Sequence, residues 1–208
     1  MKRLIAGILM GLVILFTTGC DTQPKSYKDL LSSNSVMQHH DPSVIYVTGN
    51  FYEGSAIPFI YATTKDPSIR HYTVRITSSG GDAYGCTVMI NHIAKLKRQG
   101  IKFTMIVDGK AYSAGFFLFM MGDERIMTPG SLLMIHTMEA QKVSEGKVIP
   151  EMYLPFLRYL DNNIMNQTYK VYPNVDRMLL ETMLAYSGAT FVNADEAVEV
   201  GLADRIEG

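Results

Sequence analysis

The spacing of apolar residues divides the chain after residue 42 into repeated strand-turn-helix units. Short β-branched or aromatic runs predict strands at residues 44–48, 72–77, 101–107, 125–128 and 132–135. Apolar residues three or four positions apart predict helices at 55–64, 82–100, 113–121, 150–170, 175–184 and 194–201. Alternation of this kind predicts an α/β domain with a largely parallel sheet.

Glycines and capping residues punctuate these units. Gly49-Asn50, Ser78–Gly81 and Asp108–Lys110 each follow an apolar run, so we expect three strands to end in turns there. Asp82 and Asn193 are suited to cap the helices that follow them, because their side-chain oxygens can accept from free backbone N–H groups.

The first twenty residues have the order of a secretory signal. Lys2 and Arg3 precede an apolar run from Leu4 to Phe16, and small residues then lead to Cys20. The run has about 13 residues, fewer than the roughly 20 that a membrane-spanning helix needs. The stretch resembles a bacterial lipoprotein signal, in which cleavage precedes a lipidated Cys, although Thr17 stands where an aliphatic residue is usual. An ordinary signal anchor with a chance Cys is the alternative.

These features predict three regions. Residues 1–19 are expected to be a signal peptide, residues 20–42 a polar flexible linker anchored by lipid at Cys20, and residues 43–208 one folded domain. Asp21 beside the Cys resembles the signal that retains lipoproteins in the inner membrane of Gram-negative bacteria, so we expect the domain to face the periplasm. His39-His40 could bind a metal, but no cluster at ligand spacing accompanies the pair, and linker is the preferred interpretation.

Composition narrows the classes of function. The 208 residues carry a net charge of −1, which offers no basic surface for nucleic acid. The two cysteines, Cys20 and Cys86, cannot make a disulfide framework, and Cys86 lies on the apolar stripe of its helix. We expect no cofactor and no metal.

Three segments offer the parts of an acyl-transfer site. Ser113 stands among small residues at a strand-to-helix junction, Gly80 and Gly81 let backbone approach a substrate, and His136 follows a strand as a possible base. Taken singly, the serine could simply pack, the glycines could form a tight turn, and the histidine could be a satisfied core or surface residue.

In this order the segments resemble the proteolytic subunit of Clp protease, the caseinolytic serine peptidase family. SSGGD at Ser78–Asp82 is similar to the family's SPGG turn, AYSAGFFL at Ala111–Leu118 to its ASMGAFLL segment, and LMIHTM at Leu133–Met138 to its VMIHQP segment. NADEAVEVGLADRI at Asn193–Ile206 is similar to SAPEAVEYGLVDSI. The resemblance implies a ClpP/crotonase-like α/β fold of repeated strand-turn-helix units with a protruding long helix, the handle, at residues 151–170.

The resemblance also assigns roles. It implies that Ser113 is the nucleophile, that His136 is the general base, and that the backbone N–H groups of Gly81 and Ala114 form the oxyanion hole. It further implies a peptidase that forms a homo-oligomeric ring and acts on peptides or unfolded proteins. The family's ATP-driven partner is not expected, because ATP is not available outside the cytoplasmic membrane.

The third triad position departs from the family pattern. Ala189 occupies the place of the Asp that orients the histidine, and replacing that Asp by Asn in a serine protease lowers turnover about ten-thousandfold. Residues that could substitute are Asp161, Asn162, Asn163, Ser187 and Thr190. The alternative is a catalytically degenerate, oligomeric scaffold or peptide-binding lipoprotein. A Ser-Lys dyad using Lys110 is a further alternative, although related lysines come from elsewhere in the fold.

Overall fold

The computed structural model describes residues 36–38, 40–136 and 189–208, together with residues 162, 166, 178 and 181. Its strands are β1 (Val36–Gln38), β2 (Val44–Phe51), β3 (His71–Gly81), β4 (Lys102–Tyr112), β5 (Glu124–Met127), β6 (Leu132–Ile135), β7 (Thr190–Asn193) and β8 (Arg205–Ile206). Its helices are the short 3-10 turn η1 (Glu53–Ser55), α2 (Ala56–Thr64), α3 (Ala83–Arg98), α4 (Ala114–Phe119) and α8 (Ala194–Glu199).

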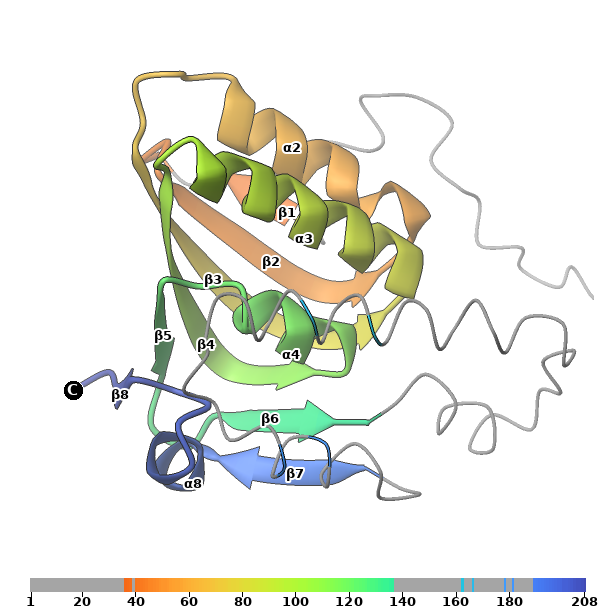
Figure 1. Cartoon of the computed structure of the whole chain (residues 1–208), viewed down its shortest axis with the longest axis vertical. Coiled ribbons are helices and arrows are strands. Elements are labelled where there is room, and N and C mark those ends of the chain that lie inside the picture. The colour runs from red at the N-terminus through yellow and green to blue at the C-terminus, as the bar shows by residue number, and fades with distance from the viewer. Residues whose placement is uncertain are drawn as a thin grey trace, which may run out of the picture.

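Within this described part, the strands form one mostly parallel sheet (Figure 1). The order β1-β2-β3-β4-β5-β8 runs across it, and β6 and β7 extend it beside the end of β4. The pairs β1–β2 and β6–β7 are antiparallel, and the remaining pairs are parallel. The predicted α/β class is therefore confirmed, and the arrangement is that of a ClpP-like fold.

The helices pack on the sheet through the faces that the spacing predicted. Met89, Ile90, Ile93 and Leu96 of α3 are buried, and Gly100 ends the helix with φ +82°. All six residues of α4 are buried, so the all-apolar run predicts its position correctly. Figure 1 shows α2 beside α3, with α4 below them next to the end of β4.

Three strands continue through glycines that we expected to form turns. β2 runs on through Gly49 to Phe51, β3 through Ser78 to Gly81, and β4 through Gly109 to Tyr112. The three turn predictions are wrong because each irregularity is absorbed as a slip in the strand pairing, so the chain bulges without reversing.

β4 changes partner along its length. Thr104–Val107 pairs with β5, whereas Lys110–Tyr112 pairs with β6. Gly109, with φ +97°, lies between the two segments. The carboxyl end of β4 is thereby brought beside the carboxyl end of β6.

Some expectations concern segments outside this description. The predicted helices at 150–170 and 175–184, including the handle, lie outside the described residues except at isolated positions, as does the signal region. β1 falls inside the segment expected to be a linker and adds an edge strand that we did not predict. Among the described residues, no helix is long and apolar enough to cross a membrane.

Candidate active site

Ser113 has an unusual backbone conformation at the junction of β4 and α4. Its φ of 54° and ψ of −119° make it the one non-glycine residue with positive φ in the described part of the chain. Its N–H donates to the Met134 carbonyl at 2.8 Å, and its carbonyl accepts from the Phe116 N–H at 3.0 Å. Such strain costs on the order of 1–3 kcal/mol and persists only where the surroundings enforce it, most often at functional sites.

Gly80 lies directly against this junction. A Cβ added at Gly80 would come within 2.7 Å of the Ser113 Cβ and 2.6 Å of the Tyr112 carbonyl oxygen. Its φ of +87° also disfavours any other residue. The end of β3 can therefore approach Ser113 only with glycine at this position.

Gly81 is equally constrained, but against β2. Its φ is +128°, and an added Cβ would run into the Phe51 carbonyl. The next residue, Asp82, donates its N–H to that same carbonyl at 3.0 Å. The segment predicted to be a substrate-facing turn is thus a strand end, packed between the end of β2 and the Ser113 junction.

His136 is brought to Ser113 by the pairing of β4 with β6. Tyr112 and Met134 are partners in this parallel pair, so the residues that follow them leave adjacent strand ends in the same direction. His136 comes directly after β6 and is 9% exposed. Open α/β sheets carry their sites at the carboxyl ends of strands, which is where both candidates lie.

Ala189 lies just before the start of a strand, β7, that runs antiparallel to β6. It directly precedes β7, whose Thr190 pairs with Ile135 in the antiparallel hairpin with β6. Ala189 is exposed. Ser113 and His136 therefore follow the ends of β4 and β6, and Ala189 precedes the start of β7. Figure 1 shows these strand ends on the same side of the sheet, and the third position carries only a methyl group.

Most of the residues that could replace the missing triad carboxylate lie outside the part of the chain that the structure describes. Asp161, Asn163 and Ser187 lie outside the described residues. Asn162 is helical and exposed, and Thr190 is the first residue of β7.

Lys110 is turned toward an aromatic ring. Its ammonium lies 5.6 Å from the centroid of the Tyr112 ring, two residues along β4 and so on the same side of the strand. This contact gives Lys110 a place in the fold that does not involve the Ser113 hydroxyl.

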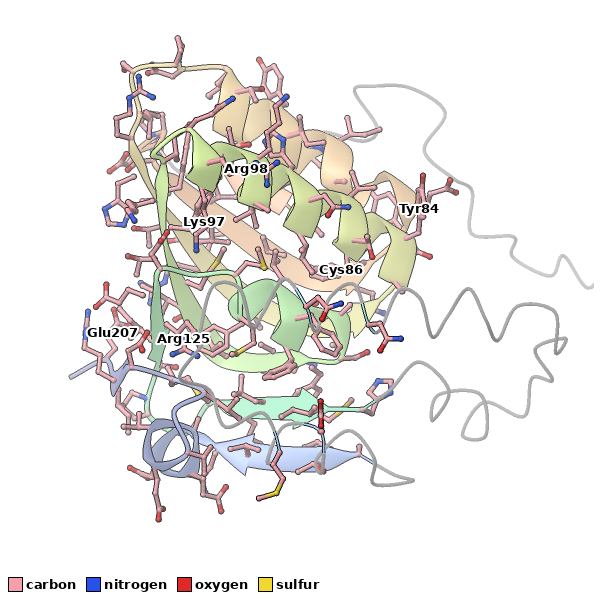
Figure 2. All side chains as sticks on the ribbon, viewed as in Figure 1. Tyr84, Cys86, Lys97, Arg98, Arg125 and Glu207 are labelled. Atoms are coloured by element: carbon pink, nitrogen blue, oxygen red, sulfur yellow. The ribbon has the colours of Figure 1, made fainter. Side chains whose placement is uncertain are left out.

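Cys86 and Asp82 serve packing and capping. Cys86 is fully buried on α3 (Figure 2), its Sγ–H donates to the Ala114 carbonyl at 3.2 Å, and burial raises the pKa of its thiol far above the ordinary value. Asp82 accepts from the Gly85 N–H at 2.7 Å as the cap of α3. Both structural interpretations are confirmed. No group of three or more metal-ligating side chains occurs among the described residues, His40 included.

Ser78 is a residue that we did not single out. It is fully buried, its hydroxyl donates to the Gly49 carbonyl at 2.7 Å, and it accepts from the Gly80 N–H at 3.0 Å. A signal was present in the sequence, because Ser78 continues the alternating buried positions Tyr72, Val74 and Ile76. A polar residue on an otherwise apolar strand face must find a hydrogen-bond partner inside the protein.

Comparison with known families agrees with this arrangement. Residues 41–208, which include every strand from β2 to β8, match the family model described as Clp protease. No curated protein matches the chain well enough to count as a relative. Because the match extends over most of the sequence and includes every segment of the candidate site, the chain belongs to the Clp protease family.

Proposed function

We propose that the protein is a serine peptidase that uses Ser113 as nucleophile and His136 as general base. Membership of the Clp protease family supports a peptidase at the level of the family. The specific roles of the two residues, and of Gly81 and Ala114 as oxyanion donors, are our proposal. The observation that carries it is the enforced positive φ of Ser113 at the end of β4, beside β6, the strand that directly precedes His136.

The chemistry follows from that arrangement. The Ser113 hydroxyl attacks the carbonyl carbon of a peptide bond while His136 accepts its proton. The N–H groups of Gly81 and Ala114 stabilise the negative oxygen of the tetrahedral intermediate. His136 then returns the proton to the leaving amine, and water hydrolyses the acyl ester by the same steps in reverse.

Labelling with a fluorophosphonate probe tests this proposal directly. The full chain, purified in detergent, is expected to react covalently at Ser113, and the Ser113→Ala variant should not be labelled. Hydrolysis of short fluorogenic peptides should be lost in the same variant. A folded wild-type protein that neither labels nor hydrolyses peptides across pH 6–9 would refute the proposal.

Ala189 favours a second candidate function, a catalytically degenerate scaffold. Without a group that orients the imidazole and stabilises its cation, turnover falls by as much as about ten-thousandfold, or roughly 5.5 kcal/mol of barrier. Under this alternative the protein still forms oligomers and binds peptides, as the family does. Peptide binding by wild type and by Ser113→Ala would then be equal, and neither would cleave the peptide.

The amino terminus supports a lipid-anchored peptidase that works without ATP. The signal-like residues 1–19 followed by Cys20 and a polar segment fit a domain tethered by acyl chains on the periplasmic face of the inner membrane. Short or already unfolded peptides are the substrates proposed for such a site. Turnover of these peptides without nucleotide is expected, and activity only with ATP and an unfoldase would contradict this part.

The anchor has its own test. Cells that express the full chain are grown with labelled palmitate, and membrane and soluble fractions are compared. Wild type is expected to carry the label and to sediment with membranes, whereas Cys20→Ala should not carry the label. A wild-type chain that carries no palmitate and keeps its full length would contradict lipidation and support the alternative of an uncleaved signal anchor.

A further inference from the structure

We propose that Ser78 is a positioning residue whose hydroxyl holds the Gly80-Gly81 segment in the conformation that presents the Gly81 N–H to a reacting carbonyl. This inference rests on the proposed function for its catalytic consequence. The hydrogen bonds that motivate it are independent of that function.

Ser78 lies where the pairing of β3 slips on both sides. Toward β2, Gly49 pairs with Ser78 and Asn50 pairs with Gly80, so Ser79 is skipped. Toward β4, Ile76 pairs with Val107 and Ser78 pairs with Ala111. One residue of β3 therefore lies opposite three residues of β4 between these two pairs. Bulges of this kind disrupt the ladder locally and leave backbone groups that need other partners.

The Ser78 hydroxyl supplies those partners. It donates to the Gly49 carbonyl across the β2–β3 pair at 2.7 Å and accepts from the Gly80 N–H at 3.0 Å. A hydroxyl has one donor and two acceptor sites, so both contacts are made at once. Because Ser78 is fully buried, bulk water cannot take over when the hydroxyl is removed.

The held segment is the one that touches the nucleophile. Gly80 packs so closely on Ser113 and Tyr112 that no Cβ fits between them. Ser78 also approaches the first turn of α4, since a Cβ added at Gly115 would lie 3.4 Å from the Ser78 Cβ. Ser78 therefore lies between the segments that carry the two proposed oxyanion donors, Gly81 and Ala114, and acts through them.

Ser131 provides a matched control for a buried serine. It is also 0% exposed, and it lies between the turn at Pro129-Gly130 and the start of β6. Its hydroxyl has no hydrogen-bond partner among the described residues. Ser131→Ala therefore removes the same atom from the same degree of burial without breaking a hydrogen bond.

The first measurement compares peptide hydrolysis by wild type, Ser78→Ala and Ser131→Ala. Misplacing one oxyanion donor is expected to lower kcat about ten- to a hundredfold in Ser78→Ala while KM stays the same, because the donor acts only on the transition state. Ser131→Ala should stay within about twofold of wild type, since it leaves the site's hydrogen bonds intact. A Ser78→Ala variant with unchanged kcat, or with a loss confined to KM, would overturn the inference.

The second measurement is amide hydrogen exchange of Gly80, followed by NMR in protein labelled with ¹⁵N-glycine. The Gly80 amide should be protected in wild type and in Ser131→Ala and should exchange faster in Ser78→Ala. An unprotected Gly80 amide in wild type overturns the inference even if Ser78→Ala does not fold. If wild type does not react with fluorophosphonate, the proposed function fails, and exchange alone decides whether Ser78 positions this segment.

Discussion

Ala189 stands across from His136, one step beyond the last paired residues of β6 and β7. The register joins Leu132 to Asn193 and Ile135 to Thr190, so the next residues outward are His136 and Ala189. Directly opposed residues of an antiparallel pair have Cβ atoms about 4.5–5.5 Å apart on the same face. A carboxylate at position 189 would therefore lie within reach of the imidazole, as a triad requires.

Ala189→Asp is accordingly expected to raise activity. The new carboxylate would orient His136 and stabilise its cation, so kcat for a fluorogenic peptide should rise at least about tenfold, with an upper bound near ten-thousandfold. Ala189→Asn is the matched control, because its side chain has nearly the same size but lacks the carboxylate charge. Equal kcat for Ala189→Asp and wild type would indicate that another residue already orients the histidine.

Gly80→Ala should eliminate reaction of Ser113 with fluorophosphonate. The methyl group would meet the Ser113 Cβ and the Tyr112 carbonyl, so the junction must move. Gly109→Ala isolates the backbone effect, since Gly109 has φ +97° with nothing within 4 Å of its added Cβ. We expect the control to lose only about 1–2 kcal/mol of stability in a urea titration and to retain labelling. Normal labelling of Gly80→Ala would contradict this prediction.

The ion pair between Arg125 and Asp204 should stabilise the carboxyl-terminal segment. Arg125 is 3% exposed, and its guanidinium donates to Asp204 at 2.9 Å and 3.3 Å and to the Gly201 carbonyl at 3.0 Å (Figure 2). Asp204→Asn would remove the negative charge that accepts two of these hydrogen bonds, and breaking a buried ion pair in this way costs about 3 kcal/mol in comparable sites.

The control for that pair is the exposed contact of Glu124 with Arg205 at 2.9 Å. Glu124→Gln should change the free energy of unfolding by less than about 1 kcal/mol, because solvent screens exposed pairs. If denaturant titrations gave similar decreases in the free energy of unfolding for Asp204→Asn and Glu124→Gln, the burial of Arg125 would not add to the strength of its ion pair.

Cys86 should resist thiol reagents in the folded protein. It is fully buried, and burial raises the pKa of its thiol, so the reactive thiolate is scarce even at pH 8. In a Cys20→Ala background, a maleimide is expected to react with the chain only after denaturant is added. Rapid labelling of the native chain at pH 8 would show that Cys86 is accessible.

His92 should make the fold less stable in acid. Burial and the nearby Lys95 lower the pKa of His92 below its ordinary 6.5. The unfolded chain therefore binds a proton at His92 more readily than the folded chain does. The contribution of neutral His92 to the free energy of unfolding is fully present above pH 6.5 and is lost as the pH falls toward the lowered pKa of the folded state. Melting temperatures of wild type and His92→Gln, measured from pH 8 to 5, should diverge at the alkaline end and converge at the acidic end. Parallel curves would exclude His92 as the cause.

Local chemistry in the sequence was sufficient to predict much of the fold, whereas the roles of the candidate site residues stay predictions. The apolar stripe of α3, the all-apolar α4 and the caps at Asp82 and Asn193 depend on short-range spacing and on hydrogen bonds within three residues. For that reason they could be predicted without knowing the rest of the molecule. Ser113 and His136 were found because their segments resemble a known family.

Strand lengths and the role of Ser78 depended on contacts between distant parts of the chain. A glycine that ends an isolated strand cannot be told from one that bulges inside a paired strand, because the difference lies in the neighbouring strand. Thus β2, β3 and β4 extend past the expected ends, and Ser78 becomes the partner of Gly49, 29 residues away.

The sequence by itself determined which residues are available for acyl transfer and which helices bury their apolar faces, since both follow from residue type and local spacing. Only the tertiary structure decided that β4 changes partner at Gly109, so that its end lies beside β6, and that the β6–β7 register places position 189 and His136 one residue beyond the same paired ends. The physical reason is that strand pairing is set by backbone hydrogen bonds between segments far apart in the chain, which no local pattern encodes.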